Sequence, residues 1–486
     1  MGGRARSRAA SLIDAVVVGG GPNGLAAAVA IAREGFRVHL IEAADEVGGG
    51  ARSRELTVPG VLHDICSGIH PFAAASPFLK TLGLEAEGLR WQWSEVECAH
   101  PLDGGRAAAL YRDVEQTAAG LEGRDGDAWR RLFAPLAERF DLLTEDLLRP
   151  VLRVPHHPFA TARFGLRALL PATAIARRWR GEEARALFAG CAAHAFHPLT
   201  RPTTAAIGMM LIVSAHAVGW PVAEGGSAAI TRALAARLET LGGTIETGVR
   251  VTSLGELPPA RTVLLDLSPR DVVRIAGQRL PGRVSRALSR YRYGPAAFKL
   301  DLAVEGGIPW TNVECRRAAT VHVGGTLEEI VASEAELHRG RMPANPFLLV
   351  GQQYLADPGR SKGDVHPVWT YAHVPAGYTG DAGEAILSQI ERFAPGFRDR
   401  IVAKHVATPA DIEAYNSNYV GGDISTGANS PLQVLFRPRL ALDPYATGTG
   451  NVFICSAATP PGAGVHGMCG ANAALSALRV LRARQR

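Results

Sequence analysis

The sequence predicts an α/β protein with two domains: one is built on a parallel sheet, and in the other a helical cap covers a mixed sheet. Three observations lead to this prediction. A strand, a glycine-rich turn, a helix and a second strand succeed one another within residues 15–43. Residues 113–218 are mainly helical in pattern, whereas residues 296–373 alternate as strands do. A second glycine-rich turn, at residues 462–467, follows an apolar run near the end of the sequence.

The first of these elements is a glycine-rich turn between a strand and a helix. The apolar run Val16–Val18 predicts a buried strand, and Leu25–Glu34 predicts a helix. Gly35 ends that helix, and Arg37–Ile41 predicts a second strand. Strand, turn, helix and strand in this order are the context that a dinucleotide-binding turn requires.

The turn itself has the pattern G-x-G-x-x-G, with Gly19, Gly21 and Gly24. The first two glycines let the backbone approach a pyrophosphate, and the third lets the helix pack on the strand. The helix N-terminus adds unpaired N–H groups and a positive dipole. Glu42, which closes the second strand, can accept hydrogen bonds from ribose hydroxyls. The alternative is a glycine-rich turn that binds nothing; the full context favours a dinucleotide site.

A second glycine-rich stretch follows that strand. Gly48, Gly49 and Gly50 form a turn, and Arg52 comes shortly after it. Glycines allow a ligand to approach closely, and an arginine can pair with pyrophosphate oxygens. An ordinary turn with a surface arginine is the alternative, and the nearby dinucleotide motif favours the binding role.

The helical region at residues 113–218 is interpreted as a cap. It contains His194 and His197, whose i, i+3 spacing could place two metal ligands together. No carboxylate or third histidine is near them in the sequence. We therefore favour histidines that are hydrogen-bonded in the core or that line a cavity, and we predict no metal site.

Residues 220–277 predict further helices and strands, which we interpret as a return of the chain to the nucleotide-binding domain. Val249 and Val251 would lie at the edge where an adenine could rest. No second G-x-G-x-x-G follows a strand later in the sequence. The sequence therefore predicts one dinucleotide site and no separate nicotinamide-binding domain.

The alternating region predicts a sheet beneath the cap. In AFKLDLAV, the apolar side chains face one way, whereas Lys299 and Asp301 face the other. In VWTYAHVP, Trp369, Tyr371 and His373 share one face. Such a sheet could form one wall of a ligand cavity, or it could simply pack against helices. Both interpretations remain open from the sequence alone.

Composition excludes several classes of protein. The 486 residues are 47% hydrophobic, and no run approaches the ~20 apolar residues of a membrane span. The net charge of +6 comes from scattered arginines, which indicates a solvated surface rather than a nucleic-acid interface. The tail at residues 1–12 is basic, we expect it to be disordered, and no apolar signal core follows it. We expect a cytoplasmic protein.

The cysteines help to decide which class of dinucleotide-binding protein this is. None of the six forms a C-x-x-C pair or a zinc-binding cluster: Cys66, Cys98, Cys191, Cys315, Cys455 and Cys469. Disulfide reductases also begin with a dinucleotide motif, but they need a redox pair shortly after it. The spacing argues against that class and fits a reducing compartment.

One long ligand, FAD, explains both glycine-rich turns, which lie more than four hundred residues apart. The first turn would bind the pyrophosphate. The last turn, with Gly462, Gly464 and Gly467, would bring backbone N–H groups and a helix N-terminus to the flavin ring. A helix N-terminus there stabilises the negative charge of reduced flavin at N1–C2=O. NAD would not need this second site.

The end motifs also carry a family resemblance. VVVGGGPNGLAAAVA…EAADEVGGGARS together with LFRPRL…NVFICSAATPPGAGVHGMCGANAA resembles flavoproteins of the phytoene desaturase type, within the amine oxidase superfamily. The segments FKLDLAVEGGIPW, VWTYAHVP and YNSNYVGGD are most similar to the branch that includes bacterial relatives of pyridine nucleotide-disulfide oxidoreductase domain-containing protein 2. The resemblance implies a glutathione-reductase-like, Rossmann-type FAD domain.

The resemblance also implies site residues. Contacts to FAD fall on Gly19, Gly21, Pro22, Asn23, Gly24, Glu42, Ala43, Gly49, Ala51, Arg52, Val251, Gly464, Val465 and Gly467. Catalytic candidates are Lys299 and His466, and substrate candidates are His70, Trp369, Tyr371, His373 and Tyr419.

Two of these candidates need comment. Lys299 resembles the lysine that amine-oxidase-type enzymes hold near flavin N5, and the alternative is a solvated lysine paired with Asp301. His466 stands where carotenoid desaturases often have proline, which argues against carrying over a carotenoid substrate.

We therefore expect a discontinuous FAD domain at residues 12–90, 220–295 and 436–486, with the substrate domain at 91–219 and 296–435. The expected activity is hydride removal from a hydrophobic or amine-type small molecule, by a desaturase, dehydrogenase or oxidase. Oxygen, a quinone or another acceptor would reoxidise the flavin. A redox-neutral double-bond isomerase, and a non-catalytic protein that binds lipids or prenylated proteins, are the alternatives. The intact last glycine-rich turn argues against the non-catalytic binding protein. A peripheral membrane contact and a homodimer both remain open.

Overall fold

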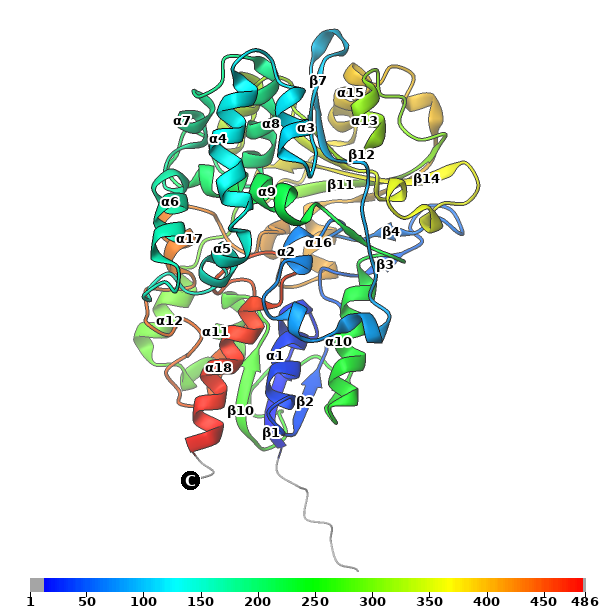
Figure 1. The fold of residues 1–486 in the computed structure, drawn as a ribbon. Coiled ribbons are helices and arrows are strands. Elements are labelled where there is room, and N and C mark those ends of the chain that lie inside the picture. Colours follow the sequence, from blue (N-terminus) through cyan, green and yellow to red (C-terminus); the bar gives the residue numbers. More distant parts are fainter. Residues whose placement is uncertain (1–12, 484–486) are drawn as a thin grey trace, which may run out of the picture.

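Two sheets organise residues 13–483, which are the part of the chain that this computed structural model describes (Figure 1). The expectations for the basic tail at residues 1–12 lie outside the described residues. The first sheet is parallel throughout. Its strands, in spatial order, are β16 (Val452–Ile454), β10 (Ala260–Leu265), β1 (Ile13–Val18), β2 (Val38–Ile41) and β9 (Thr244–Glu246). The strand order brings distant parts of the sequence together.

Helices cover both faces of this parallel sheet. Val17 faces a core shared with α1 (Pro22–Ala32), α10 (Ala228–Thr240) and α18 (Met468–Ala483). Its neighbours Val16 and Val18 face a second core with α11 (Pro269–Ala276) and α12 (Gly282–Ser289). Because successive strand residues point to opposite faces, β1 is apolar in every position from Ala15 to Val18, as a strand buried on both sides must be.

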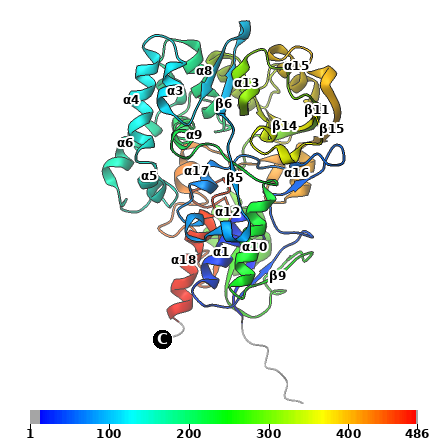
Figure 2. The same cartoon turned by 45° about the vertical axis from the view of Figure 1, so that its right-hand side comes forward.

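The second sheet is mixed and lies above the first one (Figures 1 and 2). Its pairs are antiparallel except for β6 with β12. In spatial order the strands are β15 (Ile401–Ala407), β11 (Ala296–Glu305), β14 (Val365–Val374), β13 (Leu348–Gly351), β12 (Ala318–Val323), β6 (Val96–Pro101) and β7 (Ala107–Leu110).

A helical cap lies beside the mixed sheet, as the sequence pattern predicts. Its core is aromatic: the rings of Trp129 and Phe133 are 4.5 Å apart, and those of Trp129 and Trp179 are 5.3 Å apart. Its helices are α3 (Val114–Ala119), α4 (Asp125–Ala137), α5 (Phe140–Leu147), α6 (Pro158–Ala168), α7 (Ala172–Ala176), α8 (Glu182–Ala193) and α9 (Thr204–Val218).

Shorter elements connect these layers. Two small antiparallel pairs consist of β3 (Ser53–Arg54) with β4 (His63–Asp64), and β5 (Trp91–Gln92) with β8 (Val222–Ala223). The remaining α-helices are α2 (Pro71–Ala74), α13 (Val313–Arg317), α14 (Leu327–His338), α15 (Gly383–Phe393), α16 (Pro409–Tyr415) and α17 (Pro431–Phe436). Within residues 13–483, no helix combines the length and the apolar character needed to cross a bilayer.

The first helix differs from its predicted bounds in an informative way. It begins at Pro22 instead of Leu25, because proline fits the first helical position, where no hydrogen bond from its nitrogen is needed. It ends at Ala32, and Gly35 follows in a left-handed conformation with φ +80°. The glycine turn therefore leads directly into the helix, so the N–H groups of the first helical turn lie next to Gly21.

Candidate active site

One large cavity of about 910 Å³ lies between the parallel sheet and the mixed sheet with its cap. Both glycine-rich turns line it, together with residues of α6, α9, β14 and the segments 414–419 and 456–466. The volume is at the upper end of the ~300–1,000 Å³ of small-molecule sites. Two turns that are far apart in sequence thus share one site.

The glycines of the first turn are required by close backbone approach. A Cβ atom on Gly21 would lie 2.8 Å from the Oδ2 atom of Asp266, and one on Gly24 would overlap the carbonyl oxygen of Gly19. Gly49 meets the same turn, because its Cβ would lie 2.9 Å from the Cα of Gly21. Gly19, Gly21 and Gly49 line the cavity, whereas Gly24 lies beneath its wall. The third glycine of the motif therefore serves packing.

Glu42 is held rigidly at the carboxyl end of β2. Its Oε2 atom accepts a hydrogen bond from the backbone N–H of Gly20 at 2.6 Å, and Oε1 accepts one from Ala44 N–H at 2.8 Å. The carboxylate is buried and lines the cavity beside Ala43. Its position next to the glycine turn is the one that a ribose-binding acid needs.

Arg52 is buried, which does not match an ordinary surface arginine. Its Nη2 atom donates to the carbonyl oxygen of Glu46 at 2.9 Å and lies 3.7 Å from Oε1 of Glu42. Its guanidinium lies 5.4 Å from the centre of the Tyr415 ring. The cation lines the cavity, so it can face an anionic ligand from a fixed position.

Sequence reasoning missed Asp266, at the carboxyl end of β10. Its Oδ2 atom accepts a hydrogen bond from Gly24 N–H at 2.9 Å, so it reaches the first turn of α1. Burial raises the pKa of Asp266 to about 7, and the nearby charge of Glu42 acts in the same direction. The sequence did carry a signal, because Asp266 directly follows the apolar strand β10, and the carboxyl ends of neighbouring parallel strands meet at one edge of the sheet.

The last turn also reaches the cavity, but its glycines have a second cause. Gly462, Gly464 and Gly467 have φ values of +116°, +135° and +66°, a region that side chains disfavour. Gly464 and Val465 line the cavity. Gly467 does not, because its Cα faces α1, where a Cβ would lie 2.8 Å from the Cβ of Ala26. Only part of the turn can therefore contact a ligand.

His466 lies in the same turn and lines the cavity. The backbone N–H of Met468 donates to its Nδ1 atom at 3.0 Å, so the imidazole proton must reside on Nε2. Burial lowers the pKa of His466 to about 4, which keeps the ring neutral at physiological pH. A neutral donor rather than a cation therefore stands at this end of the turn.

Three substrate candidates line the cavity. Tyr419 lies beside Gly50, where its hydroxyl would overlap a Cβ atom, whereas Trp369 and Tyr371 of β14 line the other end. Burial raises the pKa of Tyr371 above its ordinary range, so its hydroxyl remains protonated. Apolar side chains of the cap complete this end, namely Phe164, Leu169, Ile207, Met210 and Leu211.

Two predicted substrate residues are not in the cavity wall. His70 lies behind it and contacts Ser67 Oγ through Nε2 at 3.1 Å. His373 shares a strand face with Trp369 and Tyr371, as predicted, but Phe196 stacks on its ring at 3.7 Å and separates it from the cavity. Its Nδ1 atom contacts Glu334 Oε1 at 2.7 Å. The alternation predicts the face correctly but not the side chain that covers it.

Lys299 also lies outside the cavity wall, and it is not a solvated residue either. It is buried, its Nζ atom forms an ion pair with Asp301, and it donates to the carbonyl oxygen of Asp64 at 3.2 Å. The Trp369 ring, which does line the cavity, has its centre 5.8 Å from Nζ. The pairing with Asp301 matches the second alternative from the sequence, but the lysine is buried instead of solvated, because β11 is covered on both faces. A catalytic role for Lys299 stays a prediction.

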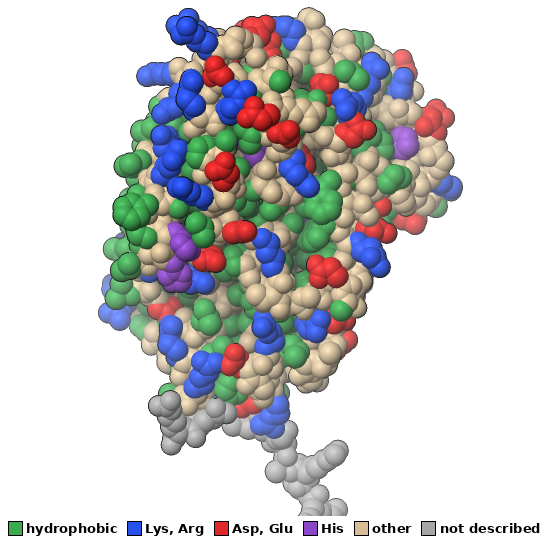
Figure 3. All heavy atoms as spheres, in the orientation of Figure 1, with side chains coloured by type: hydrophobic (Ala, Val, Ile, Leu, Met, Phe, Trp, Pro, Cys, Tyr) green, Lys and Arg blue, Asp and Glu red, His purple; other side chains and the backbone are tan. Residues whose placement is uncertain are grey.

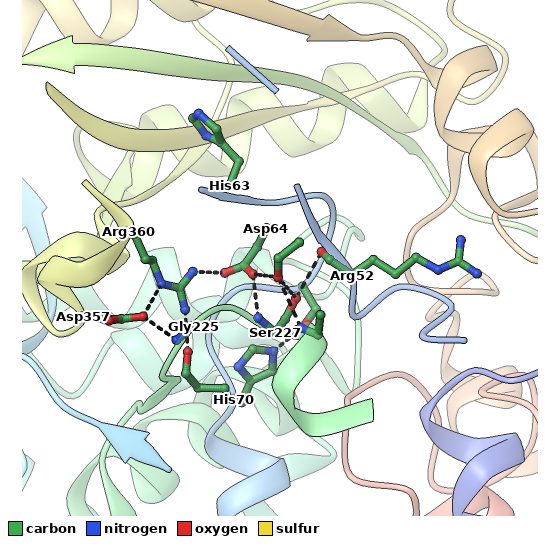
Figure 4. Close-up of polar contacts among 12 residues, drawn as sticks. Arg52, His63, Asp64, His70, Gly225, Ser227, Asp357 and Arg360 are labelled. Carbon is green, nitrogen blue, oxygen red and sulfur yellow. Dashed lines mark hydrogen bonds and ion pairs between the residues drawn. The ribbon is translucent and has the colours of Figure 1, made fainter. Parts of the chain in front are cut away.

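A buried network of charges supports the wall near Arg52 (Figure 4). Asp64 forms an ion pair with Arg360 and accepts hydrogen bonds from Ser227 N–H and Ser53 Oγ, both at 2.7 Å. Arg360 also pairs with Asp357 at 2.9 Å. The network joins β3 and β4 to the start of α10, and removing one partner would leave a buried charge without compensation, which is strongly destabilising.

His194 and its buried partner form a second polar cluster. His194 lines the cavity, as one of the two sequence interpretations predicts, and its Nε2 atom lies 2.9 Å from Nε2 of His322. His322 in turn contacts Cys98 Sγ at 3.4 Å through Nδ1. His197 lies elsewhere, against the ring of His338 at 5.3 Å. The structure thus separates the two histidines that the sequence spacing suggested as a pair.

Comparisons with known proteins match this architecture. The family described as NAD(P)-binding Rossmann-like domain matches residues 17–82. Pyridine nucleotide-disulfide oxidoreductase domain-containing protein 2 of Mus musculus is 24% identical over 96% of this chain and 94% of its own length. Phytoene dehydrogenase of Streptomyces griseus is 26% identical over 93% of this chain and 92% of its own length.

A solved structure of putrescine oxidase bound to putrescine has a TM-score of 0.62 and 17% identity, and the match covers 98% of this chain and 99% of that one. At this identity the likeness concerns the fold. We conclude that residues 17–82 match a Rossmann-like nucleotide-binding domain, that the whole chain shares its fold with putrescine oxidase, and that it is similar to phytoene dehydrogenase along most of its length.

Proposed function

We propose that the protein binds FAD and is an FAD-dependent oxidoreductase that removes hydride from a hydrophobic small molecule. The observation that carries this proposal is the single cavity whose one end is formed by both glycine-rich turns and whose other end is formed by aromatic and aliphatic side chains. Bound flavin would supply the hydride acceptor. The protein supplies binding, orientation and a dry site.

The residues at the nucleotide end fit the successive parts of FAD. Glu42 can accept from ribose hydroxyls, and Val249 and Val251 line the wall next to it. The glycine backbone and Arg52 face the pyrophosphate, which needs N–H donors and a fixed cation. Gly464, Val465 and His466 stand at the flavin end, where His466 can donate one hydrogen bond from Nε2.

The charges in the wall favour a neutral substrate over a cationic amine. Among the described residues that line the cavity, the acids are Glu42, Asp266 and Asp271, and all belong to or adjoin the parallel sheet. The end formed by Phe164, Met210 and their neighbours contains no carboxylate that could hold an ammonium group. Since a buried cation without a partner is costly, a dehydrogenase or desaturase acting on an apolar molecule is favoured.

Two measurements on the purified protein test this proposal. Its absorption spectrum and the released cofactor, identified by chromatography, test for FAD. Colourless protein that takes up no added FAD would refute the proposal and support a binding protein instead. Anaerobic mixing with polyenes and with amines should bleach the flavin only for an apolar substrate. Double-bond migration without net bleaching would instead identify an isomerase.

A further inference from the structure

One side of the cap carries large hydrophobic side chains that are exposed. On and around α6, Phe159 is 89% exposed, Val154 85% and Leu166 74%. The segment after α17 adds Leu442, which is 87% exposed. Figure 3 shows hydrophobic side chains projecting along the edge of the molecule where Figure 1 places α6. We call this surface the α6 face; its other members are Val151, Leu169, Leu170, Leu432 and Leu440.

Arginines predominate among the charges next to this face, although Glu145 and Asp146, just before this segment, pair with His157 and Arg153. Residues 147–181 contain seven arginines and no aspartate, glutamate or lysine: Arg149, Arg153, Arg163, Arg167, Arg177, Arg178 and Arg180. The whole chain, by contrast, has 52 basic and 46 acidic residues. On α6 itself, Arg163 and Arg167 are one turn apart, and Arg167 Nη1 donates to the carbonyl oxygen of Arg163 at 3.0 Å. The α6 face is therefore apolar with a cationic border.

The cavity opens at the same face. Val151 and Leu169 are exposed on the outside and also line the cavity. Helix α6 has its exposed side on the α6 face and its buried side, with Phe164 and Ala168, in the cavity wall. One amphipathic helix thus separates the interior of the site from the surroundings of the protein.

We propose that the α6 face docks on the surface of a bilayer that contains anionic phospholipids. An apolar patch rimmed by arginines is the composition that interfacial helices use: the apolar side chains enter the boundary of the acyl chains, and the cations attract anionic headgroups. No described helix could cross the bilayer, so the contact is peripheral.

Charge favours a bilayer over a second copy of the chain. A two-fold symmetric dimer would place this arginine-rich face against itself, and like charges would oppose each other across the interface. Nucleic acid would satisfy the arginines but would leave Phe159, Val154 and Leu166 without apolar partners. An anionic bilayer satisfies both components.

Vesicle flotation tests the proposal on the full-length protein. We expect binding to phosphatidylcholine vesicles that contain about 30 mol % phosphatidylglycerol, at least ~10-fold weaker binding to phosphatidylcholine alone, and loss of binding in high salt. Phe159→Ser with Leu166→Ser should weaken binding to the anionic vesicles at least ~10-fold. Arg163→Glu with Arg167→Glu should do the same.

Matched variants on other faces serve as controls. Val313→Ser with Val402→Ser removes exposed hydrophobic side chains from α13 and β15, and Arg232→Glu with Arg279→Glu reverses two exposed charges elsewhere. Both should bind as the wild type does. All variants are compared after thermal melting shows equal folding.

Three outcomes would overturn the proposal. The first is a wild-type protein that does not float with anionic vesicles. The second is an equal loss of binding in the α6-face and control variants. The third is a wild-type dimer, seen by light scattering, that Phe159→Ser with Leu166→Ser dissociates, because the face would then be a contact between copies of the chain. Flotation needs no turnover, so it is independent of the proposed reaction.

Discussion

The two ends of the cavity are built from different kinds of chemical group. At the nucleotide end, backbone groups of two glycine-rich turns face the cavity, and the charged side chains Glu42, Arg52 and Asp266 are held by hydrogen bonds. At the far end, the wall consists of side chains of β14, α6 and α9. The first end specifies a ligand by spacing and charge, whereas the second end specifies it by shape and apolar surface.

The largest expected effect is loss of the cofactor from the nucleotide end. In Gly21→Val, the side chain would collide with the Asp266 carboxylate and occupy the wall of the cavity. We expect FAD affinity to fall at least ~1,000-fold, which corresponds to about 4.1 kcal/mol. The measurement is the flavin content of purified protein and titration with added FAD.

Gly165→Ala is the matched control at the far end. Gly165 lines the cavity on α6, and a Cβ there meets nothing within 4 Å. This variant should retain full flavin. If both Gly21→Val and Gly165→Ala keep FAD, the first glycine-rich turn does not bind the cofactor.

The pH dependence of the free energy of unfolding tests the nucleotide end in the protein without cofactor. Because the pKa of Asp266 is raised to about 7 by burial, the folded state binds a proton between about pH 4 and pH 7 that the unfolded state has released. Asp266 therefore adds to the free energy of unfolding at low pH, and this contribution is lost as the pH rises to about 7. The loss is on the order of 4 kcal/mol at pH 8.

Asp266→Asn should remove this pH dependence. Denaturant unfolding of the apoprotein at pH 5 and pH 8 measures it, as the difference between wild type and variant. If the free energy of unfolding changes equally between pH 5 and pH 8 in the wild type and in Asp266→Asn, Asp266 is not a buried carboxyl group that binds a proton in this range.

Variants of Lys299 test the region behind the far end of the cavity. Lys299→Met leaves Asp301 buried without its closest cation, so the free energy of unfolding should fall by about 3 kcal/mol. Adding Asp301→Asn should restore most of that loss. If Lys299 also promotes oxygen reaction, flavin reoxidation in the double variant should slow at least ~10-fold, or about 1.4 kcal/mol. Stopped-flow mixing of photoreduced protein with oxygen measures this rate.

Equal reoxidation rates in that double variant and the wild type would leave Lys299 with a structural role only. The comparison separates stability from catalysis, because the double variant removes the unpaired charge. It also decides whether a group outside the cavity wall contributes to the far end.

The smallest effect is expected at the last turn. Gly464 has φ +135°, so Gly464→Leu adds backbone strain of about 2 kcal/mol and places a side chain in the cavity wall. We expect the FAD to be retained in part, with a shifted flavin spectrum and redox potential. Gly35→Leu, also at positive φ but in open space, controls for strain alone. An unchanged spectrum in Gly464→Leu would place the flavin ring elsewhere.

Sequence patterns predicted the nucleotide end far better than the far end. The spacing of Gly19, Gly21 and Gly24 imposes one backbone geometry, so the turn, its helix and Glu42 could be placed without a structure. Asp266 was missed because its contact with Gly24 joins residues 242 positions apart.

The far end depends on which side chain covers which. Strand alternation placed Tyr371 and His373 on one face, but only the packing of Phe196 from the cap excludes His373 from the cavity. Lys299 is buried because β14 and β15 flank its strand and further layers cover it. Local periodicity contains no information about such long-range neighbours.

The position of β16 has a consequence for how the protein is made. This short strand pairs with β10 and is contributed by residues 452–454, so the parallel sheet that carries the first glycine turn is finished only when the ribosome has added them. At ~5–20 residues per second, synthesis from the end of β10 to the start of β16 takes roughly 10 to 40 s. Throughout that interval the edge of β10 lacks its partner and can pair with another nascent chain. We therefore expect translation that stops before residue 452 to yield an aggregation-prone polypeptide instead of a smaller working protein.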